Sequence, residues 1–385
     1  MGNLILNSLE IRNFRGFQHL TIEHLGRVNL IVGKNNIGKS SLLEALQLYA
    51  QRGTPTLIWE LIRIRDESKY FIGVRDESQS RSSFDRPSFD RPMNIEDQLF
   101  ALRNLFYGRK DMRSLLESIQ IGAIGSPDEQ ISIAIGWYVE EADEQTRSKR
   151  RLLQSEQYSM FDNPEPRFTV QIGGRQKIDY PLNPSPISKL LGPDIKEINY
   201  ISRPANGLTR RQVGKLWDSI SLTPLEKDVL SSMRLIAPGV EGLSLVEDAI
   251  YTRERIPIVK IAGIDDPLPL RSLGDGMQRM LEVSLALANA RDGILLIDEI
   301  ENGIHYSVQP ELWQLIFQLA HRLNVQVFAT THSWDCIEGF QKAATENTDE
   351  EGMLIRLSLL GDDVIATSFD ERKLGIATRQ QIEVR

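Results

Sequence analysis

Eight residues near the start of the chain have the types and the spacing of a phosphate-binding loop. Gly33-Lys34-Asn35-Asn36-Ile37-Gly38-Lys39-Ser40 fits the pattern G-x-x-x-x-G-K-[ST]. In this pattern glycines let backbone N–H groups turn toward phosphate oxygens, the lysine reaches the β and γ phosphates, and the serine binds Mg²⁺. We therefore predict an ATP and Mg²⁺ site here. Its predicted nucleotide-binding residues are Gly33, Asn35, Asn36, Gly38, Lys39, Ser40 and Ser41, with Ser40 also a metal ligand.

The segments on either side of the loop suit this interpretation. Residues 28–32, VNLIV, are apolar enough for a buried strand, and residues 41–46, SLLEAL, open an amphipathic helix. A helix that begins at the loop turns its N-terminus toward the bound anion. The sequence thus predicts the strand, loop and helix that the motif requires.

An acidic pair later in the chain suits the metal and the attacking water. In GILLIDEIENGIH, residues 293–305, the apolar run 294–297 predicts a buried parallel strand that ends at Asp298 and Glu299. We predict that Asp298 binds Mg²⁺, directly or through water, and that Glu299 orients and deprotonates the attacking water.

A third strand end carries a histidine. In VQVFATTHSWD the run 325–329 predicts another buried strand, followed by residues 330–333, TTHS. Ligands of open α/β sheets bind at such strand ends. We predict that His332 contacts the γ-phosphate and takes part in catalysis.

A second anion site is predicted at the start of a long helix within residues 270–290. Ser272, Gly274 and Gly276 precede that helix, where a hydroxyl and exposed N–H groups can bind phosphate. If this loop and Lys39 lie at opposite edges of the domain, one nucleotide cannot use both in one subunit. We therefore expect a head-to-tail dimer, or a larger homo-oligomer, in which each chain offers this loop to its partner's nucleotide.

The composition excludes several protein classes. The 385 residues are 41% apolar and 25% charged, which is typical of a globular protein of one or two domains. Neither a secretory signal nor a membrane-spanning run is evident, so we expect a cytoplasmic protein without membrane contact. The single cysteine, Cys336, excludes an internal disulfide framework, and the histidines are not spaced as a metal site. The net charge of −8 argues against a surface that coats DNA, although residues 147–151 and 210–211 are basic enough for local contact.

The hydrophobic pattern predicts alternating strands and helices. Residues 4–32 are expected to form antiparallel strands broken at 13–16 and 24–26. The repeats RDES and SFDRP make residues 65–92 a polar, mobile insert. Further strands are expected at 131–141, at 167–182 with a turn at Gly173-Gly174, at 197–204 and around Gly361, and helices at 95–120, 209–236, after 274 and at 308–322.

Together these motifs resemble the ABC-type ATPases of the RecF/SMC/OLD group, especially their stand-alone AAA-like bacterial members. The resemblance covers residues 1–50 and 195–385 and rests on LEIRNFRGF, GKNNIGKS, SLGDGMQR, LLIDEIENGIH and TTHS. It implies that ATP clamps a dimer, that hydrolysis releases it, and that residues 301–305 lie at the dimer interface.

The chain departs from that group in three respects. Residues 272–276 read SLGDG where the group has an LSGGQ-like signature, and no glutamine can be assigned to link the nucleotide to the attached lobe. OLD nucleases carry a TOPRIM nuclease domain after the ATPase, whereas the segment after His332 is too short for one. The expectation is therefore an ATPase without its own nuclease.

The predicted fold is α/β, a P-loop NTPase of the ABC type with antiparallel N-terminal strands and an inserted mixed α/β lobe. Its expected parts are residues 1–64, an inserted lobe at 65–194, and residues 195–385. The predicted function is an ATP-hydrolysing switch that controls a separate effector protein, a nuclease or toxin in anti-phage defence or DNA maintenance. The alternatives are a DNA-repair clamp that binds DNA itself, a transporter ATPase subunit, and a GTPase, which the absence of N-K-x-D makes weaker still.

Overall fold

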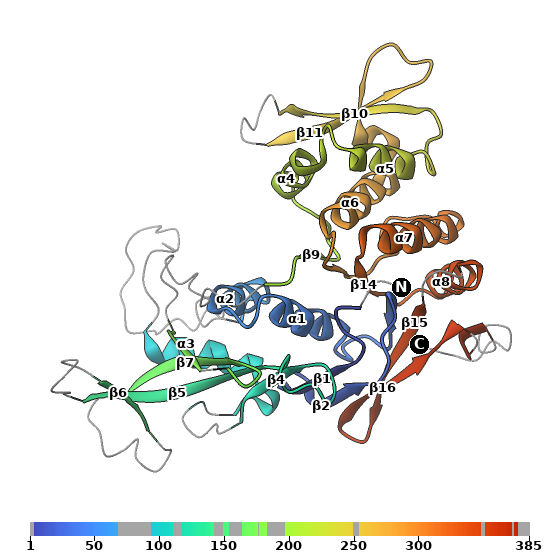
Figure 1. The fold of residues 1–385 in the computed structure, drawn as a ribbon. Helices are drawn as coiled ribbons and strands as arrows, with labels where there is room; N and C mark the ends of the chain where they lie inside the picture. Colours follow the sequence, from blue (N-terminus) through green and yellow to red (C-terminus); the bar gives the residue numbers. More distant parts are fainter. Residues whose placement is uncertain are drawn as a thin grey trace, which may run out of the picture. The chain divides into compact units, whose positions relative to one another are not determined.

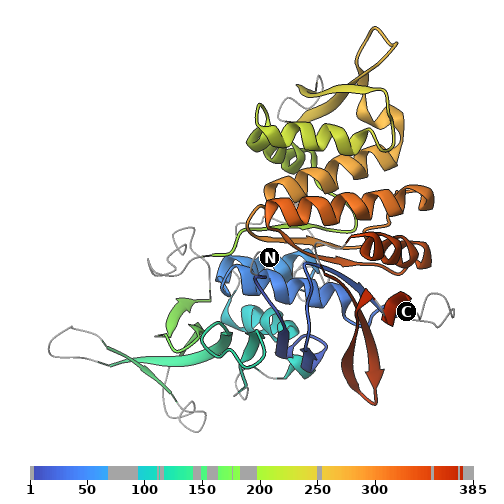
Figure 2. The same ribbon diagram turned by 45° about the vertical axis from the view of Figure 1, so that its right-hand side comes forward.

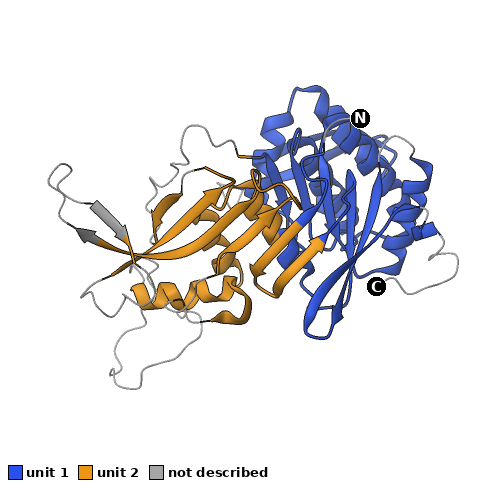
Figure 3. Ribbon diagram, turned by 60° about the horizontal axis from the view of Figure 1, so that its bottom comes forward, with its two compact units in different colours: residues 1–9, 22–43, 198–385 blue, residues 10–21, 44–197 orange. Residues whose placement is uncertain are grey.

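The computed structural model describes residues 4–67, 94–110, 112, 117–141, 149–153, 164–175, 177–182, 197–248, 254–347, 351–371 and 373–375. The chain divides into two compact units, one of residues 1–9, 22–43 and 198–385 and the other of residues 10–21 and 44–197 (Figure 3). The predicted boundaries at residues 64 and 194 stay a prediction. The polar repeats from residue 68 to 92 lie outside the described residues. In the basic cluster at 147–151, only the backbone of residues 149–151 is described.

The first unit is built on a six-stranded sheet. Its strands, in spatial order, are β16 (Asp363–Phe369), β15 (Gly352–Leu360), β3 (Val28–Val32), β14 (Gln326–Thr330), β13 (Ile294–Ile297) and β9 (Tyr200–Arg203). The five strands from β15 to β9 run parallel, and β16 pairs antiparallel with β15. The carboxyl ends of β3, β13 and β14 therefore meet at one edge of the sheet, where the predicted motifs follow.

The central strands are almost wholly apolar because both faces of the sheet are covered. Every residue of β3, β13 and β14 is buried. Helices α6 (Asp275–Asn289), α7 (Gln309–Leu323) and α8 (Trp334–Glu346) supply much of the covering layer (Figures 1 and 2). Trp313, Phe317 and Phe340 are fully buried in the core between these helices and the sheet.

A smaller part of the same unit packs along α6. It contains helices α4 (Arg210–Ile220) and α5 (Pro224–Met233) and a sheet of β10 (Val240–Glu247), β11 (Arg255–Ile261) and β12 (Leu268–Pro269). The described elements of this unit also include two short 3₁₀ turns, η4 (Leu270–Leu273) and η5 (Tyr306–Val308). Trp217, Met233 and Leu281 lie in a second apolar core that joins α4, α5 and α6.

The second unit is built on a seven-stranded sheet. Its order is β2 (Phe17–Ile22), β1 (Leu9–Phe14), β4 (Ile119–Gly122), β5 (Ile131–Glu141), β7 (Glu165–Ile172) and β8 (Ile178–Pro181), with β6 (Lys149–Leu152) also paired to β5. Its helices are most of α1 (Lys39–Ala50), α2 (Pro55–Ile64) and α3 (Ile95–Leu102), with the 3₁₀ turns η1 (Arg103–Leu105) and η2 (Tyr107–Arg109). The pairings of β4, β5, β7 and β8 are antiparallel.

Most of the predicted elements are confirmed, but one is wrong, and β3, expected among the antiparallel N-terminal strands, pairs in parallel with β14 and β15. The α/β class, the strand at 131–141, the turn at Gly173 with φ 55°, and the helices after 209, 274 and 308 all agree with the structure. The expected helix at 95–120 ends early, and residues 119–122 form strand β4 between β1 and β5. Pairing with two neighbouring strands overrides the local pattern there. Helices α2 and α8 and strand β10 are elements that the sequence pattern did not indicate.

Candidate nucleotide site

The loop between β3 and α1 has the backbone of a phosphate cradle. Gly33 and Gly38 have positive φ angles of 147° and 108°, which glycine adopts without a steric cost. Asn36 also has a positive φ, 63°, and asparagine is enriched in this region. A Cβ at Gly33 would lie 2.6 Å from the backbone oxygen of Leu357, so only glycine fits. Asn35 and Asn36 are exposed, whereas Ser41 is buried.

Lys39 lies across this loop and donates hydrogen bonds to backbone carbonyls. Its Nζ donates to Gly33 O at 2.7 Å and to Lys34 O at 3.2 Å. Partial burial lowers the pKa of Lys39, and the nearby carboxylates of Asp298, Glu299 and Glu301 oppose that shift. An anion in the loop would add a stronger partner for this ammonium group than carbonyl oxygens provide.

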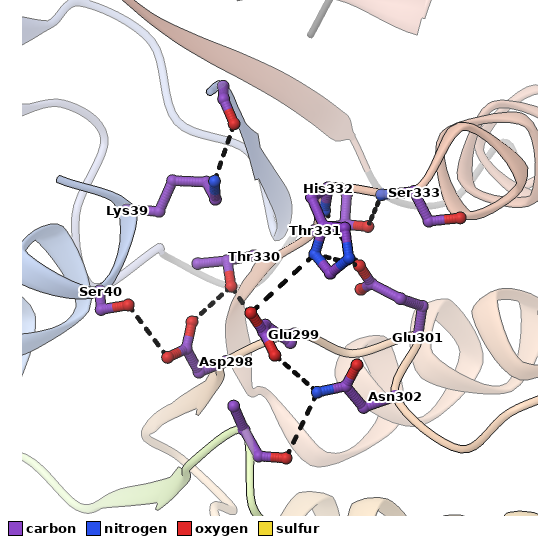
Figure 4. A network of polar contacts seen from close by, with 12 residues as sticks. Lys39, Ser40, Asp298, Glu299, Glu301, Asn302, Thr330, Thr331, His332 and Ser333 are labelled. Carbon is purple, nitrogen blue, oxygen red and sulfur yellow. Dashed lines mark hydrogen bonds and ion pairs between the residues drawn. The ribbon is translucent and has the colours of Figure 1, made fainter. Parts of the chain in front are cut away.

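Ser40 and Asp298 meet although 258 positions separate them in the sequence. Ser40 Oγ donates to Asp298 Oδ2 at 3.0 Å, and Thr330 Oγ1 donates to Asp298 Oδ1 at 2.6 Å (Figure 4). The ends of β13 and β14 and the start of α1 thus converge on one carboxylate. The hydroxyl and the carboxylate are oxygen ligands of the kind that Mg²⁺ prefers.

Glu299 has an unusual backbone that the neighbouring strand holds in place. Its φ is 49°, uncommon for a residue other than glycine. Its backbone N–H donates to Thr330 Oγ1 at 2.9 Å, and Asn302 Nδ2 donates to its Oε2 at 2.6 Å. Two contacts, one to the backbone and one to the carboxylate, therefore fix where this glutamate lies (Figure 4).

His332 lies over the same acidic cluster, with about half of its side chain exposed. Its Nδ1 is 3.0 Å from Glu301 Oε1 and 3.9 Å from Glu299 Oε1. Its backbone N–H also donates to Glu301 Oε1 at 3.0 Å. Glu301 thus contacts both the backbone and the ring of His332 (Figure 4).

The loop with Ser272, Gly274 and Gly276 belongs to a different part of the first unit. Ser272 and Gly274 are exposed, and Gly274 takes φ 92° just before α6. In the described part of the chain, no hydrogen bond or ion pair joins these three residues to Lys39, Ser40, Asp298 or Glu299. The loop does approach the segment after the acidic pair, because a Cβ at Gly276 would lie 3.2 Å from Gly303 O.

The structure adds contacts that the motif analysis did not predict. Thr330 touches both Asp298 and Glu299, Asn302 contacts Glu299, and Glu301 contacts His332. The polar TTHS segment directly after an apolar strand was the available signal for Thr330. Its partners could not be read from the sequence, because they depend on the β13–β14 register that sets Ile297 opposite Ala329.

The residues at this site are suited to bind Mg²⁺ and a nucleoside triphosphate. The loop cannot accept a Cβ at Gly33, and Lys39 lies partly desolvated beside it. Ser40 and Asp298 offer an oxygen donor pair, with Glu299 next along the chain. Among the described residues, no group of three His, Cys, Asp or Glu side chains is placed to bind a metal by itself. No helix in the described ranges is both long and apolar enough to span a membrane.

Comparison with known proteins gives matches at both ends of the chain. A family described as "AAA ATPase domain" matches residues 5–162, and one described as "AAA domain, putative AbiEii toxin, Type IV TA system" matches residues 256–335. An "ATP/GTP phosphatase" from Helicobacter pylori is 25% identical over 354 residues, which is 87% of each chain. "DNA replication and repair protein RecF" from Clostridioides difficile is 34% identical over 70 residues, 18% of this chain and 19% of that protein.

Among solved structures, the Smc head domain from Pyrococcus furiosus, bound to the C-terminal domain of ScpA, is 9% identical. That comparison covers 98% of this chain and 99% of the Smc chain, with a TM-score of 0.48.

Proposed function

We propose that this chain, which is an AAA-type ATPase, acts as a molecular switch. Binding of Mg·ATP closes a dimer of two copies of the chain, and this dimer controls a separate effector protein. The observation that carries the proposal is the contact of Ser40 with Asp298, which brings the phosphate loop to the acidic strand end. Glu299 follows Asp298 directly, with its carboxylate held by Asn302. A glutamate held in this way suits a general base.

The proposed roles follow from this arrangement. Lys39 and the backbone of residues 33–38 bind the phosphates, and Ser40 and Asp298 hold the metal. Mg²⁺, when bound, would offset phosphate charge. Glu299 orients the attacking water and accepts its proton, and His332 contacts the terminal phosphate. Thr330 holds Asp298 and Glu299 in position through its two hydrogen bonds.

The proposed dimer rests on the exposed loop at Ser272. This loop begins a 15-residue helix, whose N-terminus favours an anion. Within the described residues it makes no polar contact with its own chain's phosphate loop. A second copy would therefore bring Ser272, Gly274 and Gly276 to the nucleotide held at Lys39. The output is a change of assembly, which a nuclease or toxin partner in anti-phage defence or DNA maintenance would sense.

The experiment compares Glu299→Gln with the wild-type chain. Loss of a positioned general base typically slows turnover by ~10²- to 10⁴-fold, while the phosphate-binding groups remain. We expect Glu299→Gln to bind ATP and to accumulate as an ATP-dependent dimer, or as a more compact oligomer. Sedimentation with and without Mg·ATP, beside a phosphate-release assay, measures both properties on one sample.

The control is Glu311→Gln, an exposed glutamate in the first turn of α7, which should behave as wild type. Wild-type turnover in Glu299→Gln would remove the catalytic assignment. Reduced turnover without ATP-dependent assembly would leave that assignment and remove the dimer.

Direct DNA binding is the second candidate function, and the match to RecF favours it. The formal charge of −8 opposes it. Titration of the purified chain with duplex DNA at two salt concentrations separates the two functions. Salt-sensitive binding that depends on ATP would favour a DNA clamp over the control of a separate effector.

A further inference from the structure

A buried arginine stands beside the acidic strand end, although no motif indicates it. Arg203 is the last residue of β9, and its side chain is fully buried. The register of β9 and β13 places it opposite Ile297, and Arg203 O accepts a hydrogen bond of 2.9 Å from Asp298 N. The backbone of Arg203 thus helps to position the proposed metal ligand.

The side chain of Arg203 points to helix α6. Arg203 Nε donates to Glu282 Oε2 at 3.2 Å, and the Glu282 side chain is only 1% exposed. Arg279 Nη1 donates to the same oxygen at 3.2 Å. One buried carboxylate therefore joins β9 to the helix that begins at the Ser272 loop.

The contacts continue to that loop. Gln278 Nε2 donates to Glu282 Oε1 at 3.0 Å, and Arg271 Nε donates to Gln278 Oε1 at 2.9 Å. Arg271 directly precedes Ser272. A continuous series of polar contacts therefore runs from Asp298 through Arg203, Glu282 and Gln278 to the edge of the Ser272 loop.

The pair is poorly explained as a stabilising feature. Arg203 Nη1 and Nη2 are buried without a hydrogen-bond partner among the described residues. Most buried polar groups in proteins have partners, and apolar replacements of a buried ion pair are often as stable. Burial lowers the pKa of Arg203, while Glu282 opposes the shift.

The backbone around the pair is shaped to admit it. Gly207, four residues after Arg203, has φ 86°. A Cβ there would lie 2.7 Å from Glu282 Oε2 and closer still to Arg279 Nη1. The loop after β9 thus approaches the carboxylate as only glycine permits.

We propose that Arg203 and Glu282 are positioning residues that couple the state of Asp298 and Glu299 to the loop of Ser272. The coupling rests on the proposed function, since it presumes nucleotide at the phosphate loop. Nucleotide binding at Asp298 shifts the end of β9, and the buried pair transmits that shift to α6. The test therefore measures the response of one site to the other.

The test is hydrogen–deuterium exchange with Mg²⁺ and a non-hydrolysable ATP analogue, at a concentration where sedimentation shows monomers. In the wild type we expect slower exchange in residues 33–43 and also in 270–282. In Arg203→Met/Glu282→Met, which removes both charges together, only the response at 33–43 should remain. Turnover should fall by about tenfold, with KM changed by less than ~3-fold, as expected when an interaction made only in the transition state is lost.

Gln278→Met is the second variant, for the case that the double variant does not fold. It cuts the series of contacts without leaving a buried charge unpaired. It should remove the response of residues 270–276 only. The matched control is Ser232→Ala/Ser284→Ala, which removes a buried polar pair between α5 and α6, with Oγ atoms 2.5 Å apart; its response should equal that of the wild type.

The outcomes separate the two proposals. If either Arg203→Met/Glu282→Met or Gln278→Met folds and keeps the wild-type response at 270–276, the coupling is refuted while the ATPase switch stands. If wild-type exchange changes at 33–43 but not at 270–282, the coupling is also refuted. If residues 33–43 do not respond in the wild type, the nucleotide site itself is wrong, and the coupling falls with it.

Discussion

Thr330→Val tests the contacts that hold the two acidic residues together. Valine has nearly the shape of threonine but no hydroxyl, and Thr330 is fully buried. The wild-type hydroxyl donates to Asp298 Oδ1 at 2.6 Å and accepts from Glu299 N at 2.9 Å. The change therefore removes two hydrogen bonds at once and leaves the volume of the side chain almost unchanged.

The expected cost follows from these two bonds. A hydrogen bond to a charged group contributes about 1.5–3 kcal/mol, and a donor left unpaired costs about 1 kcal/mol or more. Because Glu299 is partly exposed, water can satisfy part of its N–H, so we expect a loss of about 3 kcal/mol in the free energy of unfolding. For a domain of 150–250 residues this lowers Tm by roughly 6–12 °C.

Turnover should fall as well, because Glu299 holds a positive φ of 49° that the Thr330 contact supports. A general base out of position loses part of its ~10²- to 10⁴-fold contribution, and we expect a fall of at least ~10-fold. Differential scanning calorimetry and a phosphate-release assay measure the two effects.

Thr331→Val is the matched control for this variant. Thr331 is equally buried, but its hydroxyl accepts from Ser333 N and touches neither Asp298 nor Glu299 in the described structure. It should lose stability without a comparable loss of turnover. Equal turnover in the two variants would refute the orienting role of Thr330, and an unchanged Tm in Thr330→Val would refute the hydrogen bonds themselves.

Two further variants test the phosphate loop. Lys39→Ala should fold but lose the rise in Tm that Mg·ATP causes, because it removes the ammonium group aimed at the phosphates; exposed Lys227→Ala is the control, and an unchanged rise in Lys39→Ala would mean that phosphate binds elsewhere. Gly33→Ala should lose nucleotide affinity by about tenfold or more, because its Cβ would lie 2.6 Å from Leu357 O and the loop must move. Gly361→Ala is the control, because it also places alanine at a positive φ, 64°, but in open space. Wild-type affinity in Gly33→Ala would show that the cradle tolerates a Cβ.

The local parts of the nucleotide site follow from the amino-acid sequence alone. The spacing from Gly33 to Ser40 specifies a loop because glycine and asparagine accept positive φ angles. The runs 294–297 and 325–329 indicate buried strands because parallel strands covered on both faces must be apolar throughout, and strands form at 294–297 and 326–330. Polar residues directly after such strands lie at the sheet edge, which placed Asp298, Glu299 and His332 correctly relative to their own strands.

Which of these residues are in contact depends on long-range strand pairing and packing. Thr330 contacts Asp298 and Glu299 because β13 and β14 pair in one particular register, and no local pattern encodes a register between distant segments. Residues 119–122 became a strand because β1 and β5 offered hydrogen-bond partners.

The buried pair of Arg203 and Glu282 shows the same limit. Each is a charged residue that the pattern of its own segment would place in solvent. Their burial follows from the packing of α6 against the end of β9, which brings together side chains 79 positions apart. Because such contacts depend on long-range packing, motifs and periodicity alone do not predict them.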